Sequence, residues 1–395
     1  MEKVKISDCC IITNGFAFKS DKYVDRDGAR VIRITNVQKG KIVDNDPKFY
    51  PFDLLKNLDA YKIFEGDILM SLTGNVGRVG KFPKEMVPGY INQRICRIMP
   101  KDERLDVNYL FQLLNSDKFE TEAMRNSSGA AQLNLSSKWL NNYEIPLPPL
   151  HIQKAIAAKL DKAQEIIAYN QQLLEKYDQL TQSLFIDMFG KENLNYYNWD
   201  EVKIADILKN KGAIRSGPFG SDLLHSEFVD SGIPVLGIDN AVLNKFQWKQ
   251  RRYITEEKYQ KLKRYQVFPK DVIITIMGTV GKVALVPDNI GVAINSKHLA
   301  AITLNQQIAN SDFIAFSLRS DLDILAQISQ KGKGAIMTGL NLSIIKGLKF
   351  KLPPIHLQNQ FAERVAQIEI QKTMAQESLA KSEQLFQSLL KESFK

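Results

Sequence analysis

The sequence predicts a mixed α/β protein of two similar halves, each consisting of a β-rich body followed by one long helix. Three observations support this fold class: the chain matches itself at an offset near 200 residues, each body ends in a Leu-Pro-Pro stretch, and a helical heptad pattern follows each stretch. With 395 residues and 44% apolar side chains, the chain can bury two cores.

The internal repeat consists of short blocks that follow one another in the same order, at offsets of 198 to 204 residues. Residues 4–8 (VKISD) match residues 202–206 (VKIAD). Ile34-Thr35-Asn36 matches Ile238-Asp239-Asn240, and only the middle residue differs. The clearest block within the bodies pairs Gly74-Asn75-Val76-Gly77-Arg78-Val79 with Gly278-Thr279-Val280-Gly281-Lys282-Val283. Matching blocks in the same order indicate a duplicated structural unit.

The two bodies, residues 1–147 and 191–352, are predicted to be mixed α/β domains. Residues 30–35, 67–72 and 272–277 are short β-rich runs bounded by glycine and asparagine turns. Residues 107–125 and 311–328 have helical spacing near the end of each body. The pattern does not fix the order of the strands.

Two long helices are predicted, within residues 148–190 and 353–395. The prolines hold extended backbone, so each helix begins near a histidine, His151 or His356. Each could run for about 38 residues, roughly 57 Å at 1.5 Å per residue. The first heptad seam is Ile156, Leu160, Ala163, Ile167, Asn170, Leu174, Tyr177, Thr181, Leu184 and Met188. The second is Phe361, Val365, Ile368, Lys372, Ala375, Leu379, Ser382, Phe386, Leu389 and Ser393.

The matched registers favour pairing of the two helices as an antiparallel coiled coil with pseudo-twofold symmetry. That arrangement would place the bodies at opposite ends. The alternative is two separate amphipathic helices, each lying on its own body. Asn170 and Lys372 are polar seam positions, expected to set the register or to contact another subunit.

Charge and composition favour a polyanion partner. The net charge is +9, with 22 Lys and Arg against 19 Asp and Glu in residues 1–150, and 22 against 15 in residues 190–355. Positive charge therefore belongs to the bodies. No long apolar run or leader-like start is present, so we expect a soluble, cytoplasmic protein.

The sequence lacks the motifs of several kinds of metal, cofactor and catalytic site. Cys9, Cys10 and Cys96 fit neither an even disulfide set nor a zinc pattern, so we expect reduced thiols and no metal site. Glycine-rich cofactor fingerprints, HExxH and GxSxG are absent from the sequence. The Gly74-x-x-Gly77 and Gly278-x-x-Gly281 spacing is too short for a nucleotide-binding P-loop. It fits either a hairpin tip or a backbone that approaches DNA.

Polar loop side chains are the candidate DNA contacts, because Asn, Gln and Arg read base edges and Lys and Ser bind phosphates. Each could equally be ordinary surface. The predicted DNA-binding residues are Lys19, Ser20, Arg33, Asn36, Thr73, Asn75, Arg78, Asn92, Gln93, Arg94, Gln132, Ser221, Asn240, Thr275, Thr279, Lys282, Asn295, Ser296, Lys297, Lys331 and Lys333.

A second set of residues is predicted to form the subunit or helix interface. His151 and His356 stand at matching helix starts, where a cap or a subunit contact is expected rather than a general base. The full set is His151, Gln153, Ile156, Leu160, Asn170, Leu174, His356, Gln358, Phe361, Val365 and Leu379.

The chain resembles the specificity subunits of type I restriction-modification systems over essentially its whole length. The resemblance rests on residues 147–153 (LPPLHIQ) and 352–358 (LPPIHLQ), on residues 66–74 and their echo at 270–278, and on the twofold repeat. Family members often carry Glu where Ile152 and Leu357 stand, so this chain departs from the pattern at each helix start.

The resemblance implies a non-catalytic DNA-binding subunit. Its bodies would be two target recognition domains, each reading one half of a bipartite, asymmetric site in double-stranded DNA. Its helices would set the spacer and dock two modification subunits, joined by restriction subunits for cleavage. This chain would need no cofactor; S-adenosylmethionine, ATP and Mg would serve the partner subunits only. The alternatives are the recognition subunit of a type IIB-like system, a two-headed protein-binding coiled-coil scaffold, and a fused nuclease-methyltransferase fragment.

Overall fold

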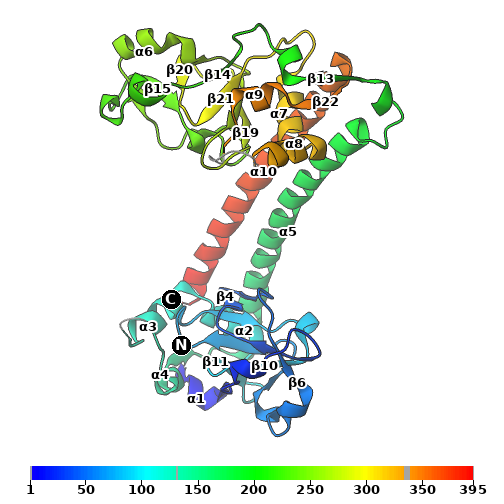
Figure 1. The fold of residues 1–395 in the computed structure, drawn as a ribbon. Helices are drawn as coiled ribbons and strands as arrows, with labels where there is room; N and C mark the ends of the chain where they lie inside the picture. The colour runs from blue at the N-terminus through cyan, green and yellow to red at the C-terminus, as the bar shows by residue number, and fades with distance from the viewer. Residues whose placement is uncertain (1, 130–131, 333–338, 395) are drawn as a thin grey trace. The chain divides into compact units, whose positions relative to one another are not determined.

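The computed structural model of the chain describes residues 2–129, 132–332 and 339–394 (Figure 1). These residues form two compact units. Unit 1 is Met1–Gln172 with Gln376–Lys395, and unit 2 is Leu173–Ala375. Two long helices, α5 (Leu150–Phe189) and α10 (Ile355–Ser393), each contribute residues to both units.

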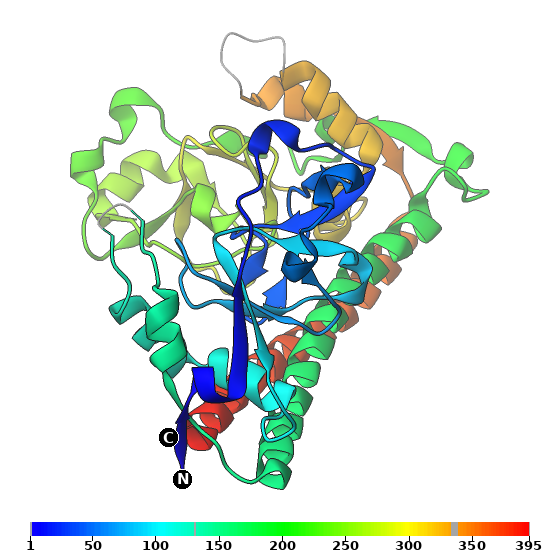
Figure 2. The ribbon, with the colours of Figure 1, turned by 90° about the horizontal axis from the view of Figure 1, so that it is seen from below.

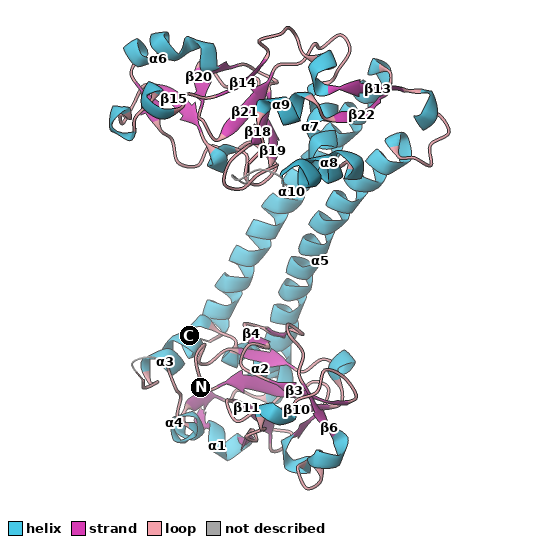
Figure 3. Ribbon diagram, in the orientation of Figure 1, coloured by secondary structure: helices cyan, strands magenta, loops and turns pink. Residues whose placement is uncertain are grey.

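Unit 1 contains two four-stranded sheets (Figure 3). One has the order β2-β11-β8-β9, formed by Cys10–Asn14, Ile95–Pro100, Ile68–Ser71 and Val79–Lys81. The other has the order β6-β3-β10-β7, formed by Phe49–Pro51, Gly28–Ile32, Gly89–Ile91 and Lys62–Ile63. Two small pairs complete the strands: β1 (Lys3–Lys5) with β12 (Glu144–Pro146), and β4 (Val37–Gln38) with β5 (Lys41–Ile42).

Unit 2 repeats this strand order. Its first sheet has the order β14-β21-β18-β19, formed by Ile214–Ser216, Leu299–Ile302, Val272–Thr275 and Val283–Leu285. The second has the order β16-β15-β20-β17, formed by Tyr253–Ile254, Ile233–Leu236, Ala293–Asn295 and Gln266–Val267. The terminal pair is β13 (Asp200–Lys203) with β22 (Lys349–Leu352). In each unit one central pair is parallel, β3 with β10 and β15 with β20.

Short helices cover the sheets of each unit. Residues 107–125 form two helices rather than one, because the Ser116 side chain accepts a hydrogen bond from Phe119 N–H and starts a new helix. Asp321 separates the two helices of residues 311–332 in the same way. The helices of unit 1 are α1 (Ile6–Cys9), α2 (Val107–Leu114), α3 (Asp117–Arg125) and α4 (Ser137–Asn142). Those of unit 2 are α6 (Glu256–Leu262), α7 (Ser311–Ser320), α8 (Leu322–Gly332) and α9 (Leu342–Lys346).

The end of α10 belongs to the core of unit 1. Phe386, Leu390 and Phe394 are buried among side chains of the first body, and the Phe394 ring lies 5.5 Å from the Tyr109 ring. The N- and C-terminal ends of the chain consequently lie near each other in unit 1, as Figures 1 and 2 both show. The C-terminal helix therefore does not pack on the second body alone.

The end of α5 belongs to the core of unit 2 in the same manner. Phe185 and Phe189 pack against Phe361 of α10 and Phe313 of α7, with ring centroids 4.8–6.1 Å apart. Aromatic pairs at such distances add to the apolar burial that fixes a helix on its body.

Inside each unit the two long helices lie side by side. In unit 1 the Asn170 amide donates to the Ser382 hydroxyl at 3.4 Å. In unit 2 the Lys372 ammonium pairs with the Asp178 carboxylate at 2.6 Å. In unit 1 the N-terminal part of α5 thus contacts the C-terminal part of α10. In unit 2 the C-terminal part of α5 contacts the N-terminal part of α10, as expected of an antiparallel pair. No residue of either predicted heptad seam is exposed. The alternative of two unpaired helices is wrong.

Candidate nucleic-acid interface

The glycine blocks lie in hairpin turns, between β8 and β9 in unit 1 and between β18 and β19 in unit 2. Gly77 (φ +79°) and Gly281 (φ +82°) adopt left-handed backbone, which a side chain would strain. The hydroxyls of Ser71 and Thr275 donate to the carbonyls of Asn75 and Thr279 and hold the turn closed. The hairpin interpretation is therefore confirmed, and whether the turns approach DNA stays a prediction.

Asn36 and Asn240 hold a second pair of matching turns. Asn36 Oδ1 accepts the Arg33 N–H and its Nδ2 donates to the Val43 carbonyl. Asn240 makes the same two bonds with Gly237 and Gln247, each displaced by 204 residues. Both asparagines are buried. Their side chains thus support the backbone beneath a loop.

Other predicted contacts also serve the fold. Asn92 accepts from the Arg94 N–H, and Asn295 donates to the carbonyls of Arg215 and Leu299. Thr275 accepts from the Lys282 N–H at 2.8 Å. These buried amides and hydroxyls are already bonded inside their own unit. We therefore leave five buried residues out of the proposed contact surface: Asn36, Asn92, Asn240, Thr275 and Asn295.

Three further candidates are partly engaged inside unit 1. Arg33 donates to the Asp46 carbonyl and carboxylate at 2.6 and 3.0 Å. Arg78 donates to the Gln38 side chain at 3.0 Å, and the Thr73 hydroxyl to the Asn134 side chain at 3.0 Å. These side chains are half-buried, so they can reach a ligand only by exchanging these bonds.

The remaining candidates have free or partly free side chains. Ser296 and Lys282 are half-buried, and Lys331 belongs to the last turn of α8, with only its backbone described. Lys333 lies outside the described residues. The exposed candidates are Lys19, Ser20, Asn75, Gln93, Arg94 and Gln132 in unit 1, and Ser221, Thr279 and Lys297 in unit 2.

A pocket of about 380 Å³ opens in unit 2 beside the turn held by Asn240. Ser296 and Lys297 line it, together with three residues that were not among the predicted DNA contacts: Asp239, Arg252 and His298. Burial, and then the neighbouring charges of Lys297 and Arg252, lower the pKa of His298. Asp239 could have been found, because it is the one differing residue in a matched block. Arg252 lies in no matched block of the repeat, so no sequence feature indicated it.

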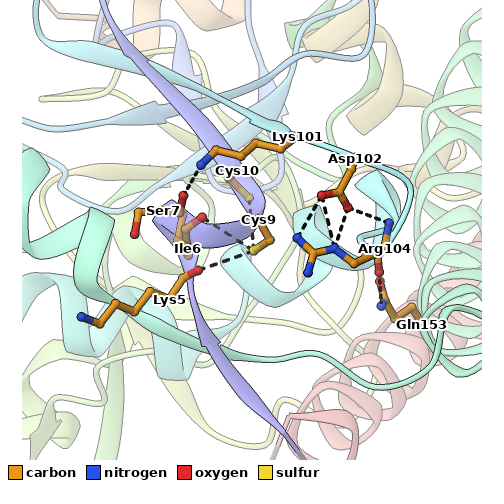
Figure 4. A network of polar contacts seen from close by, with 9 residues as sticks. All are labelled: Lys5, Ile6, Ser7, Cys9, Cys10, Lys101, Asp102, Arg104 and Gln153. Atoms are coloured by element: carbon orange, nitrogen blue, oxygen red, sulfur yellow. Dashed lines mark hydrogen bonds and ion pairs between the residues drawn. The ribbon is translucent and has the colours of Figure 1, made fainter.

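A buried glutamine fastens each long helix to its body. Gln153 Nε2 donates to the carbonyls of Pro148 and Arg104, and its Oε1 accepts the Asp106 N–H, all at 2.8 Å. Figure 4 shows Gln153 reaching Arg104, whose guanidinium pairs with Asp102. The histidines two positions earlier, His151 and His356, are exposed.

The other predicted interface residues lie along the helix pair. Asn170 is buried, and its amide meets Ser382. The apolar ones are buried or half-buried in the contacts of α5 and α10: Ile156, Leu160, Leu174, Phe361, Val365 and Leu379. These seam residues join the helices of one chain, so a partner subunit would contact other faces.

Each unit also holds an ion pair between an arginine on one strand and a buried aspartate directly before another strand. In unit 2 Arg215 donates to the fully buried Asp271, and Thr303 donates to the same carboxylate at 2.5 Å. Burial raises the pKa of Asp271, and Arg215 counteracts this shift. In unit 1 Arg97 and Asp67 stand 3.6 Å apart. These pairs belong to the folded core.

Among residues 2–129, 132–332 and 339–394, no group of three or more His, Cys, Asp and Glu could hold a metal ion. Nor is any helix in this part of the chain long and apolar enough to cross a bilayer.

A family model described as "Type I restriction modification DNA specificity domain" matches residues 1–178 and 196–384. The chain belongs to this family. The specificity subunit of the type I restriction enzyme EcoBI from Escherichia coli is 24% identical, across all of this chain and 85% of its own length. The MjaVIII specificity subunit of Methanocaldococcus jannaschii is 29% identical over 49% of this chain and 48% of its own length.

Solved structures share the fold of this specificity subunit. The S subunit of a type I restriction-modification system from M. genitalium aligns with a TM-score of 0.60 and 16% identity, covering 100% of this chain and 96% of that one. A chain solved in work on complex assembly and conformational transition of the type I R-M system gives 0.60 and 17%, covering 100% and 97%. The predicted α/β fold with two bodies and paired helices is confirmed.

Family membership decides between the classes left open by the sequence. This chain is the DNA specificity subunit of a type I restriction-modification system, and it is a non-catalytic part of that complex. A fused nuclease-methyltransferase fragment is not what the comparisons support.

Proposed function

We propose that each body reads one half of a bipartite, asymmetric DNA site. Residues 1–147 would be the first target recognition domain and residues 191–352 the second. The observation that carries this proposal is the family match to both halves of the chain, together with the identical strand order of the two units. Two copies of one fold with different loop side chains suit two different half-sites.

The contacts with DNA would come from the exposed polar loops of each body. Gln93 and Arg94 follow β10 in unit 1, and Ser296 and Lys297 follow β20 in unit 2. Arginine pairs with guanine edges, while lysine mainly contacts phosphates. The excess of positive charge in both bodies supports a long-range attraction to DNA.

The spacer would be set by the helices, within residues 148–190 and 353–395. Both helices are continuous, with 40 residues in α5 and 39 in α10. At 1.5 Å per residue each is about 60 Å long. A rigid helical pair of fixed length would hold the separation between the half-sites constant.

The partners would be two modification subunits, bound along the helices, and restriction subunits added for cleavage. S-adenosylmethionine, ATP and Mg would be used by those partners, and this chain would bind none of them. Exposed apolar side chains on the helices, such as Tyr169 in unit 1 and Ile370 in unit 2, are available for such contacts.

Methylome sequencing of host DNA, with the gene present or deleted, tests the proposal. Deletion is expected to remove adenine methylation from one bipartite motif and thereby to reveal both half-sites. An unchanged methylome, with the modification subunit shown to be expressed, would contradict it and would favour a protein-binding scaffold. Cleavage at a fixed distance on both sides of the motif would instead indicate a type IIB-like system.

A domain exchange tests whether each body reads its own half-site. Residues 1–147 would be replaced by the corresponding body of another specificity subunit. One half-site of the methylated motif is expected to change while the other stays. A change in both half-sites would refute the assignment of one half-site to each body.

A further inference from the structure

One position in the repeated turn distinguishes the two bodies chemically. The turns held by Asn36 and Asn240 have the same hydrogen bonds, yet Thr35 stands in the first where Asp239 stands in the second. Thr35 is exposed and Asp239 is half-buried. A shared frame that presents two different side chains is the arrangement expected of a position that sets specificity.

In unit 2 this position faces the pocket beside the turn. Asp239 Oδ1 accepts a hydrogen bond from Arg252 Nη1 at 3.0 Å. Asp239 Oδ2 and the Ser296 hydroxyl are both buried and have no hydrogen-bond partner among the described residues. Both residues line the pocket. Unpaired buried polar atoms are rare in folded proteins, so two that line one pocket point to a site that binds a polar group.

The chemistry of the pocket selects the ligand. A carboxylate oxygen accepts a hydrogen bond, so the ligand must carry a donor such as an amino group. Arg252 neutralises the Asp239 charge, and Lys297 is exposed at the same pocket. The site can therefore receive a group from polyanionic DNA.

We propose that the Asp239 pocket reads an exocyclic amino group in the second half-site, with cytosine N4 as the donor to Asp239 and the Ser296 hydroxyl beside it. Acidic side chains recognise cytosine in the major groove through this amino group. Thr35 would leave the corresponding position of the first half-site without this preference. The inference rests on the proposed function, because it takes DNA as the ligand of this body.

Binding selection with the purified complex of this chain and its modification partners tests the inference. Duplexes carry the methylated motif with the second half-site randomised. Asp239→Asn keeps the shape and Asp239→Thr introduces the residue of the first half. Asp222→Asn is the control, since Asp222 is exposed, loses the same charge and pairs with Arg264, and neither of these two residues lines the pocket.

The wild-type complex and Asp222→Asn are expected to select cytosine at one position of the second half-site. Both Asp239 variants should reduce that preference by about 10- to 100-fold and leave the other positions unchanged, as one mismatched base pair does. Asparagine should move the preference toward adenine, with which its amide pairs.

Three outcomes overturn the inference. The Asp239 variants could select the wild-type sequence with wild-type strength. They could lose preference at several positions at once. Both could also fail to give the cooperative melting of the wild-type complex, which would assign Asp239 to the fold. If the wild-type complex itself selects no sequence, the proposed function fails instead, so the two failures are distinguishable.

Discussion

Gln153 and Gln358 make the same three hydrogen bonds in the two units. Each amide nitrogen donates to the carbonyl of the first proline in the preceding stretch, at 2.8 Å for Pro148 and 2.7 Å for Pro353. Each also donates to a carbonyl of its body, Arg104 in unit 1 and Ile308 in unit 2. Each amide oxygen accepts the N–H of a helix cap, Asp106 in unit 1 and Asn310 in unit 2. The start of each long helix is thereby locked to the start of a helix in its body.

Gln153→Ala is expected to destabilise unit 1 by about 3 kcal/mol, because it leaves buried backbone groups without partners. Gln358→Ala should do the same in unit 2. The measurement is denaturant unfolding of the chain, followed separately for each unit. Gln171→Ala, at an exposed site on α5, is the control and should change stability by less than about 0.5 kcal/mol. Equal effects of all three substitutions would contradict the claim that Gln153 and Gln358 hold the starts of the long helices on their bodies.

Arg215→Met should cost unit 2 about 3–5 kcal/mol, because it leaves the Asp271 carboxylate buried and uncompensated. Lys349→Met removes an ion pair whose two side chains are each 54% exposed, and it should cost less than about 1 kcal/mol. Unfolding of both variants at neutral pH measures this difference. Similar losses would mean that burial does not govern the strength of these pairs.

The loss in Arg215→Met should depend on pH. Burial already raises the pKa of Asp271 above the ordinary range of an aspartate, and removal of Arg215 raises this pKa further. As the pH falls through the raised pKa, folded Asp271 takes up a proton before unfolded Asp271 does, so the variant regains stability relative to the wild type. Unfolding at pH 8 and pH 5 should show the larger deficit at pH 8. A larger deficit at pH 5 would refute this account.

The sequence alone predicted the repeat because the chain matches itself. It predicted the helix pair because both helices carry a heptad pattern of apolar residues. The heptad steps mark which residues of α5 and α10 face each other, and none of those residues is exposed. The helices begin at Leu150 and Ile355, one residue before the histidines used to mark them. Strand order was not predictable, since β2 pairs with β11 across some 80 residues of chain and no local pattern records that choice.

The predicted site was less accurate where a side chain had two possible uses. An asparagine in a polar loop has the same sequence signal whether it meets a base or holds a turn. Only burial separates them, as for buried Asn92 and its exposed neighbour Gln93. Asp239 was passed over for the opposite reason, because acidic residues are not expected in a basic surface until the Arg252 pair is visible.

The three thiols should resist modification in the folded chain. All are buried and unpaired in disulfides, and burial raises the pKa of Cys96 to about 12. The hydrogen bond from Cys10 lowers the pKa of Cys9, but Cys9 is only 1% exposed. A bulky thiol reagent should therefore modify fewer than one thiol per native chain and three after unfolding. Rapid reaction of the native protein would contradict the burial of these thiols.

Removal of exposed positive charge should change the salt dependence of DNA binding. Arg94→Ala in unit 1 and Lys297→Ala in unit 2 each delete one exposed cation next to the proposed half-site surface. The logarithm of the DNA-binding constant falls as the logarithm of the salt concentration rises. Each lost phosphate contact makes this negative slope shallower by about 1. Lys154→Ala, at an exposed site on α5, is the control and should leave the slope unchanged. DNA titrations of the assembled complex at several salt concentrations measure these slopes. Unaltered slopes in both loop variants would show that Arg94 and Lys297 do not contact the DNA.

Lengthening both long helices should lengthen the tolerated gap between half-sites. We would insert seven residues into α5 after Leu174 and seven into α10 after Ala375, between the Asn170–Ser382 pair and the Asp178–Lys372 pair. Seven residues preserve the heptad seam and add about 10 Å, which corresponds to about three base pairs. Methylome sequencing should report the same half-sites with a longer spacer. Insertion into α5 alone is the control, because it puts the two seams out of register and should abolish methylation. An unchanged spacer in the double insertion would show that the helices do not set it.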